Sequence, residues 1–444
     1  MNPRKPLWIT MLVALALLVA PLQAQSAGIT AAPGSLDTSF SADGKTTGGW
    51  AAYNDGANAV AIQRDGKIVM AGYTEYSDGD EDFLVLRYNP DGTLDSSFGF
   101  MGMVVTPFNS TYTDRANAVA IQPDGKILAA GYVYPDGPAA IAVARYNSNG
   151  SLDNTFDGDG MVVINIGNNE DVAEALVLQP DGKILLVGHS IISKLIIALA
   201  RLNSNGSLDT TFDYDGIVTT DLGTATLYDY GMAAALQSDG KILVAGYSAT
   251  YSSENITLVR YNTDGSLDTS FNGDGIVMAD LSVYDEALGL AIQPDGKIVV
   301  GGITVVLSGH DFLIARYHID GSLDTSFGFN GFNTADMCGE SESLSAIAIQ
   351  PDGNILAAGT CFSSPNHDFI LARFNSNGEL DASFDGDGKT LTNFLGCDDH
   401  GNAVAIQPDG KIIVAGESMF DSKFDVALAR YWGNSYLYLP ALRK

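Results

Sequence analysis

The sequence is poor in cysteine and in basic residues, and each shortage excludes a class of protein. Only three cysteines occur among 444 residues, all in the last quarter, so disulfides do not hold the whole fold together. Lysine and arginine number 23 against 53 acidic residues, which gives a formal net charge of -30. Because binding to nucleic acid requires cationic side chains that displace condensed counterions, we expect no nucleic-acid partner. An acidic surface instead favours a soluble monomer and repels anionic partners.

Catalytic motifs are also missing. The sequence contains no Gly-x-Ser-x-Gly elbow, no His-Glu-x-x-His helix and no phosphate-binding loop. The five histidines are dispersed over the chain: His189, His310, His318, His367 and His400. Pairs of carboxylates are frequent, but a chain with 53 acidic residues contains them by composition alone. We therefore expect a protein that is not an enzyme, without catalytic or cofactor-binding residues; a glycan hydrolase or lyase is the alternative.

The N-terminus has the pattern of a secretory signal peptide. Two basic residues precede an apolar run over residues 7–19, and small residues follow it. We predict a signal peptide over residues 1–24, cleaved after Ala24 or alternatively after Ala27, and a short linker over residues 25–35. The run is short for a bilayer span, so we expect no transmembrane segment in the mature chain. A retained N-terminal anchor is the alternative, whereas export would place the protein outside the cell or in the cell envelope.

Three motifs then recur seven times in one fixed order between residues 36 and 432. The first is Gln-x-Asp-Gly-Lys, which recurs at intervals of 56 to 59 residues and has Asn354 instead of lysine in the sixth copy. Its glutamines are Gln63, Gln122, Gln179, Gln237, Gln293, Gln350 and Gln407. The second is Leu-Asp-x-x-Phe, and the third is an arginine before Tyr, Leu or Phe. The repeat units begin near residues 36, 94, 152, 208, 267, 323 and 380.

Alternation and turn residues divide each unit into four short strands. In the second copy, residues 118–122 and 126–131 flank a Pro-Asp-Gly turn and form a hairpin. Residues 141–146 and 161–164 supply the third and fourth strands, and no segment has the periodicity of a helix. Stacking such sheets around an axis covers both faces of each sheet. We therefore predict an all-β, seven-bladed β-propeller of four-stranded antiparallel blades, with an open β-solenoid as the alternative.

The three motifs together resemble the delta-60 repeat, a bacterial β-propeller repeat, and the glycine-flanked turns are similar to NHL-type blades. The resemblance covers about residues 36–432, and it implies a propeller in an exported protein without an established activity. In NHL-type blades the strand before the Asp-Gly turn is innermost. By this analogy residues 36–47 complete the last blade, which otherwise ends at Arg430 and Tyr431. The ring would then be closed by the N-terminal segment.

An acidic residue stands eight positions before each marker glutamine, which gives seven candidate metal ligands. They are Asp55, Asp114, Asp171, Asp229, Asp285, Glu342 and Asp399. Their recurrence predicts a ring of carboxylates near one mouth of the central channel, where a hard cation such as calcium finds oxygen ligands. The alternative, which we favour, is that each carboxylate accepts backbone N–H bonds within its own loop. In that case no cofactor is required, and the Asp-Gly-Asp-Gly loops such as residues 157–160 are ordinary turns.

Two further pairings are predicted. Each repeated arginine suits a buried carboxylate, and the aspartate of Leu-Asp-x-x-Phe is its expected partner. Cys338 and Cys361 fall in loops on one face and predict a disulfide, which leaves Cys397 unpaired. A zinc site made of the three cysteines and His400 is the alternative.

A ligand site is expected in the loops that vary between units, which join outer to inner strands and second to third strands. We therefore predict a secreted or cell-surface acidic propeller that serves as a binding scaffold for a protein or a glycan. A calcium-stabilised structural module of the cell envelope is the second hypothesis. The tail over residues 433–444 lies outside the repeat, and it either packs on the last blade or acts as a sorting signal.

Overall fold

A computed structural model describes residues 31–434, except 51–52, 77–78, 109–112, 136, 168, 224–225, 283, 307–308, 364 and 395–397. All of these residues belong to one compact unit, Ala31–Lys444. The predicted signal peptide, Cys397 and nearly all of the tail lie outside the described residues. Within the described part, no helix is long and apolar enough to cross a membrane.

The described residues form 28 strands and no helix, and the strands fall into four classes, a to d. Strands a are β2 (Asp55–Ile62), β6 (Arg115–Ile121), β10 (Asp171–Leu178), β14 (Tyr228–Leu236), β18 (Asp285–Ile292), β22 (Ser341–Ile349) and β26 (Asp399–Ile406). Strands b are β3 (Ile68–Glu75), β7 (Ile127–Val133), β11 (Ile184–Ile191), β15 (Ile242–Ala249), β19 (Ile298–Val306), β23 (Ile355–Ser363) and β27 (Ile412–Phe420). Strands c are β4 (Glu81–Tyr88), β8 (Ala140–Tyr146), β12 (Leu195–Leu202), β16 (Glu254–Tyr261), β20 (Gly309–Tyr317), β24 (Asn366–Phe374) and β28 (Lys423–Tyr431). Strands d are β5 (Met103–Thr106), β9 (Met161–Ile164), β13 (Ile217–Thr220), β17 (Ile276–Ala279), β21 (Phe332–Ala335), β25 (Lys389–Thr392) and β1 (Lys45–Gly48).

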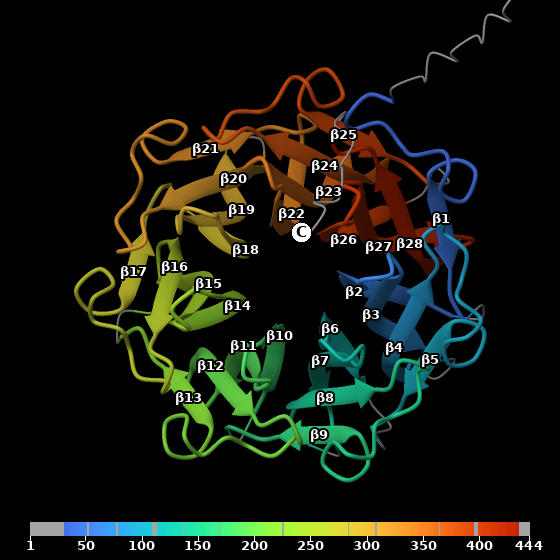
Figure 1. Cartoon of the computed structure of the whole chain (residues 1–444). Coiled ribbons are helices and arrows are strands. Elements are labelled where there is room, and N and C mark those ends of the chain that lie inside the picture. Colours follow the sequence, from blue (N-terminus) through green and yellow to red (C-terminus); the bar gives the residue numbers. More distant parts are fainter. Residues whose placement is uncertain are drawn as a thin grey trace, which may run out of the picture. The chain divides into compact units, whose positions relative to one another are not determined.

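The strands pair as antiparallel units in the order a-b-c-d, from unit one (β2-β3-β4-β5) to unit seven (β26-β27-β28-β1). Units three and four form one eight-stranded sheet, because a single parallel bridge joins Leu195 to Tyr228. The predicted all-β class and the four-stranded antiparallel units are confirmed. Figure 1 shows the units side by side around a common centre, with the strands a nearest to it.

The N-terminal segment supplies the outer strand of unit seven. Strand β1 pairs with β28 from Lys45 opposite Ala429 to Gly48 opposite Val426, and Leu36 bridges Tyr431. The first and last parts of the described chain therefore share one sheet, as the sequence predicted.

Seven buried apolar clusters hold the units together, one at each seam between neighbours. Between units seven and one, for example, Ile413 and Leu428 pack with Ile68 and Leu84. All seven residues of β8 are buried, because a neighbouring unit covers each face of this strand. Burying one large aliphatic side chain contributes about 1.5–3 kcal/mol, so each seam adds substantially to stability.

Candidate functional site

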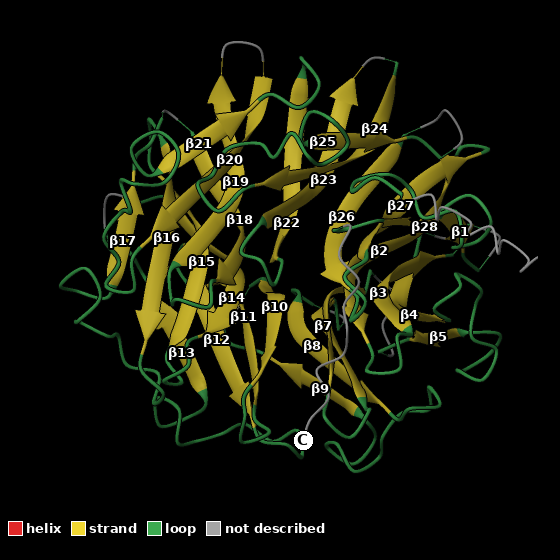
Figure 2. Ribbon diagram, turned by 45° about the horizontal axis from the view of Figure 1, so that its top comes forward, coloured by secondary structure: helices red, strands yellow, loops and turns green. Residues whose placement is uncertain are grey.

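The connections at the two ends of the strands form two faces (Figure 2). Connection lengths are constant on one face and vary on the other. The turn face carries the a-to-b and c-to-d connections. Five residues separate strands a and b in every unit, and 14 separate c and d in the six units where the chain joins them directly. The variable-loop face carries the other connections, with two to six residues between b and c and five to eight between d and a. Differences between units therefore concentrate on the variable-loop face.

The seven predicted metal ligands are buried, one in each unit. The Asp171 carboxylate accepts the backbone N–H of Ile166 at 2.8 Å and of Gly167 at 3.1 Å, together with the Ser190 hydroxyl. The other six also accept a backbone N–H from the loop before them. No group of three or more His, Cys, Asp or Glu able to hold a metal ion occurs within the described ranges. The acids thus anchor their own loops, and calcium binding by them stays a prediction.

The loop before Asp229 of unit four also binds a cation of the chain itself, Lys194 from the b-to-c loop of unit three. The Lys194 ammonium lies 3.3 Å from Asp229 Oδ2 and 2.6 Å from Asp221 Oδ1, and it donates to the Gly223 carbonyl at 2.9 Å. Lysine therefore supplies the positive charge that the carboxylates of this loop attract.

The predicted arginine–aspartate pairs are present in all seven units. They are Arg87–Asp95, Arg145–Asp153, Arg201–Asp209, Arg260–Asp268, Arg316–Asp324, Arg373–Asp381 and Arg430–Asp37. In unit two, Arg145 Nε lies 2.7 Å from Asp153 Oδ2, and the guanidinium stands 4.4 Å from the centre of the Phe156 ring. The same arginine donates to the carbonyl of Ser204 in unit three. Each arginine therefore ties its own unit to the next one.

The aspartate of each pair is held in its ionised form. Burial opposes ionisation of Asp153, but hydrogen bonds from Lys126 and Thr155 and the charge of Arg145 hold its pKa well below the usual range. Because this arrangement recurs around the molecule, its role is structural.

A different set of side chains lies beside the loop acids and changes from unit to unit. The residue after each acid faces one residue of strand b. These variable pairs are Gly56–Tyr73, Arg115–Tyr132, Val172–His189, Tyr230–Tyr247, Glu286–Ile303, Ser343–Thr360 and His400–Glu417. A β-bulge follows each pair in strand a, and bulges commonly re-aim side chains next to functional sites.

A glycine of strand b lets strand a approach closely at each variable pair. A Cβ on Gly72 would lie 1.9 Å from the carbonyl oxygen of Gly56, so no larger residue fits. The equivalent glycines of the other units approach strand a in the same way. The repeat therefore fixes the backbone and leaves the variable pairs free to differ.

Between units seven, one and two, the variable pairs form a polar cluster. Tyr73 Oη lies 2.9 Å from Glu417 Oε2, and His400 Nδ1 lies 3.2 Å from Glu417 Oε1. The Arg115 guanidinium stands 4.2 Å from the centre of the Tyr73 ring and forms an ion pair with Glu81. These contacts cross both seams, so side chains from three units form one cluster, in which Tyr73 is buried.

Between units three, four and five the cluster is aromatic and acidic. His189 and Tyr230 meet edge to face at 4.8 Å between ring centres, and Tyr230 stacks on Tyr247 at 4.9 Å. The Tyr228 hydroxyl donates to Glu254 at 2.7 Å, and Glu254 shares a hydrogen bond with Glu286 of the next unit.

Two carboxyl groups and the histidine at this second cluster have shifted pKa values. Burial raises the pKa of Glu174 to about 7. Burial and the neighbouring Glu254 raise the pKa of Glu286 to about 7. Burial lowers the pKa of His189 to about 4, so its ring is neutral at pH 7. Carboxyl groups that titrate near neutrality can donate or accept protons there.

Exposed aromatic side chains border the second cluster. Tyr251, in the b-to-c loop of unit four, is 92% exposed, and Tyr284, in the next d-to-a loop, is 41% exposed. The two loops adjoin, because the backbone of Glu254 bridges that of Tyr284.

The sequence predicts a ligand site on this face, which stays a prediction, and it did not point to these residues. The contacts of Tyr73 with Glu417 join positions 344 apart in sequence, which local patterns do not reveal. A signal was nevertheless present, because the position after each invariant acid holds seven different residues.

The predicted disulfide is present on the same face. Cys338 and Cys361 are bonded, with 6.3 Å between their Cα atoms. Because both sulfurs are used, the alternative zinc site of three cysteines does not form.

Comparisons with known proteins concern the fold. No curated protein matches the sequence. Polysaccharide lyase Uly1 is 12% identical, with 85% of this chain and 90% of that chain covered and a TM-score of 0.50. A catalytically inactive virginiamycin B lyase from Staphylococcus aureus, solved with quinupristin, is 11% identical over 87% and 98% of the chains, with a TM-score of 0.49. Sqt1 from Chaetomium thermophilum is 15% identical over 82% and 80%, with a TM-score of 0.43.

A family model matches all seven repeats and agrees with the delta-60 resemblance. The matched segments are residues 63–98, 122–156, 179–212, 237–271, 293–327, 350–384 and 407–435. The chain therefore belongs to the family described as domain of unknown function (DUF5122) beta-propeller.

Proposed function

We propose that the chain is an exported, closed seven-bladed propeller that binds a neutral glycan on its variable-loop face. The observation that carries the proposal is the contrast between two sets of positions. The arginine–aspartate pairs and loop acids repeat in every unit, whereas the variable pairs next to the loop acids differ in every unit. A surface that varies on a fixed scaffold is the usual place for recognition.

Closure of the ring is supported by three features of unit seven. Strand β1 completes its sheet, and an apolar cluster joins it to unit one. Arg430 also donates to the Pro90 carbonyl of unit one, as the other arginines do to their next units. Export is supported by the signal-peptide pattern and by the disulfide, which suits an oxidising compartment.

The chemistry of the second cluster favours a glycan. Exposed tyrosine faces such as those of Tyr251 and Tyr284 can pack on the C–H faces of a sugar ring. Carboxylates such as Glu254 can accept hydrogen bonds from sugar hydroxyls. The net charge of -30 repels anionic polysaccharides, so the expected ligand is uncharged.

The test is binding of the full chain to an array of neutral oligosaccharides, followed by calorimetry on the best ligand. We expect a Y251A/Y284A variant to bind at least tenfold more weakly, because aromatic anchors dominate such sites. The matched control is Tyr214→Ala, since Tyr214 is 93% exposed but lies in a c-to-d connection on the turn face. Absence of glycan binding by the unmodified chain, or an equal loss in the control, would refute the proposal.

Glycan cleavage is a second candidate, favoured by one observation. Glu174 has a pKa of about 7, lies beside His189 at 3.7 Å and receives a hydrogen bond from Asn117 at 3.0 Å. A carboxyl group of this kind suits general acid–base work near neutral pH. Release of reducing ends from a bound oligosaccharide, lost in Glu174→Gln while binding persists, would establish this activity; binding without turnover would exclude it.

A further inference from the structure

On the turn face, six of the seven units share a second cation that the remaining unit lacks. The repeated lysine places its ammonium 2.8 to 3.2 Å from the aspartate that also binds the arginine. These pairs are Lys67–Asp95, Lys126–Asp153, Lys183–Asp209, Lys241–Asp268, Lys297–Asp324 and Lys411–Asp37. An ammonium ion beside this carboxylate is thus a regular part of the repeat.

Unit six has Asn354 at the lysine position. Its side-chain amide turns to the Asp352 carboxylate at 3.1 Å and does not replace the missing charge. Asp381 still forms an ion pair with Arg373 at 2.9 Å, and it accepts a hydrogen bond from the Ser383 hydroxyl at 2.7 Å. Its side chain is 19% exposed, whereas the equivalent aspartates expose 1 to 7%.

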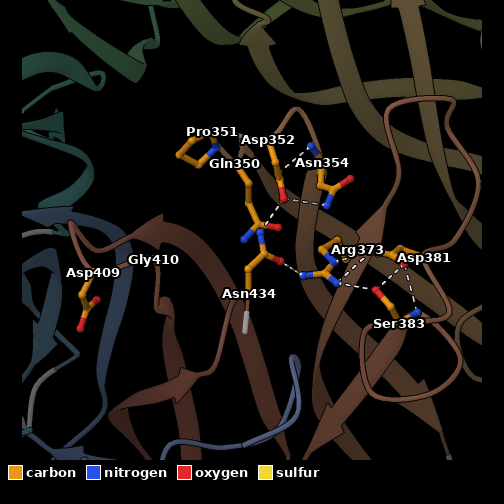
Figure 3. A pocket seen from close by; sticks show the side chains of 10 residues that line it. All are labelled: Gln350, Pro351, Asp352, Asn354, Arg373, Asp381, Ser383, Asp409, Gly410 and Asn434. Carbon is orange, nitrogen blue, oxygen red and sulfur yellow. Dashed lines mark hydrogen bonds and ion pairs between the residues drawn. The ribbon is translucent and has the colours of Figure 1, made fainter. Parts of the chain in front are cut away.

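A pocket of about 410 Å³ opens at this carboxylate (Figure 3). Asp352, Asp381 and Asp409 contribute three carboxylates to its lining; Arg373 pairs with Asp381, and Lys411 lies 3.2 Å from Asp409. The Arg373 guanidinium already has partners, because it forms an ion pair with Asp381 and donates a hydrogen bond to Asn434 Oδ1 at 2.7 Å. The pocket therefore carries an excess of negative charge.

A buried acceptor also lines the pocket. Gln350 is 2% exposed, and its Oε1 atom has no hydrogen-bond partner, as is also true of Gln63, Gln122, Gln179, Gln293 and Gln407 in units that have the lysine. A buried polar atom without a partner is costly, so a donor that enters the pocket would be stabilised there. The equivalent pocket between units three and four, of about 430 Å³, includes Lys183 in its lining.

We propose that the unit-six pocket binds a primary alkylammonium group, such as the end of a lysine side chain, in the place that the repeat's own lysine takes elsewhere. The ammonium would pair with Asp381, and its carbon stem would lie in the pocket. The group could come from an external amine or from Lys444 of the same chain.

The probe is n-pentylammonium at pH 7 and low salt, with n-pentanol as the uncharged control and saturation-transfer NMR as the readout. We expect the full chain to bind the amine and not the alcohol. Asn354→Lys gives Asp381 the ammonium that the other six units have, so it should weaken binding at least tenfold without lowering the thermal unfolding temperature. Unchanged binding to Asn354→Lys would overturn the proposal.

The opposite substitution in another unit tests the proposal even if Asn354→Lys fails to fold. Lys183→Asn should create a second amine site, which would double the stoichiometry; no gain would overturn the role of the missing lysine.

An R443Q/K444Q variant distinguishes the sources of the amine. Tighter binding than in the unmodified chain means that the tail competes for the pocket, and equal binding means that the natural amine is external.

Discussion

The junction between the two ends of the chain depends on one buried carboxylate. Asp37 is 1% exposed and lies 2.8 Å from Arg430 and 3.2 Å from Lys411. In the other six units the equivalent pair stabilises a continuous c-to-d connection, but here it joins segments from opposite ends of the sequence. Removing its charge should therefore loosen the closure itself.

The expected loss of stability follows from the burial of Asp37. Removal of one partner from a buried ion pair costs about 3–5 kcal/mol. In Asp37→Asn the amide keeps the shape of the side chain, and Lys411 is partly exposed, so we expect about 3 kcal/mol at the low end of that range. Opening of the junction would then become roughly 100-fold more frequent.

Hydrogen–deuterium exchange measures this opening directly. In Asp37→Asn, peptides that contain β1 and β28 should exchange roughly 100-fold faster. The matched control is Asp153→Asn, which loses the same contacts to Arg145 and Lys126 but leaves β9 tethered at both ends. We expect at least tenfold less acceleration for β9, and equal acceleration in both variants would refute the idea that this pair secures the closure.

Four further predictions concern stability, each measured as the free energy of unfolding. The low pKa of the repeated aspartates means that their ion pairs contribute fully above about pH 4 and are lost as the pH falls further, so acid should destabilise the chain at constant salt; a flat profile down to pH 2 would contradict this. Reduction of the bond between Cys338 and Cys361 should cost about 3 kcal/mol, and no change would mean that the loop is held by other contacts. Because the pKa of Glu174 is raised to about 7, the unmodified chain loses stability as the pH rises from 4.5 through 7, and Glu174→Gln should gain about 1–2 kcal/mol at pH 8 but not at pH 4. Lys194→Met should lose about 1–3 kcal/mol, and millimolar calcium should restore more in this variant than in the unmodified chain; equal responses would count against cation binding at Asp229.

The repeat was predictable because its constraints are local and occur seven times. The turn after each marker glutamine and the strand lengths depend on residues less than 20 positions apart, and so does the pairing of arginine with aspartate in units one to six, as in Arg145 and Asp153. The partner of the lysine was not foreseen, because Lys126 lies in the a-to-b turn and Asp153 in the c-to-d connection, and the two meet only when the sheet forms.

The variable pairs were harder to predict, because their contacts cross seams. Tyr73 meets Glu417 and Arg115, which belong to different units, and no single-unit pattern indicates either contact. The seven loop acids recur at one position of every unit. Regularity proved to indicate a loop anchor, such as Asp171 with the N–H groups of Ile166 and Gly167, and the functional candidates lie one residue further along.

The most direct test of a binding role for the variable pairs exchanges one pair for that of another unit. Unit six has Ser343 and Thr360 where unit four has Tyr230 and Tyr247, so a Y230S/Y247T variant uses residues that this backbone already accepts. We would measure its thermal unfolding and its affinity for the best neutral oligosaccharide. We predict near-normal unfolding with binding weakened at least tenfold; unchanged binding in a folded variant would contradict the proposed site.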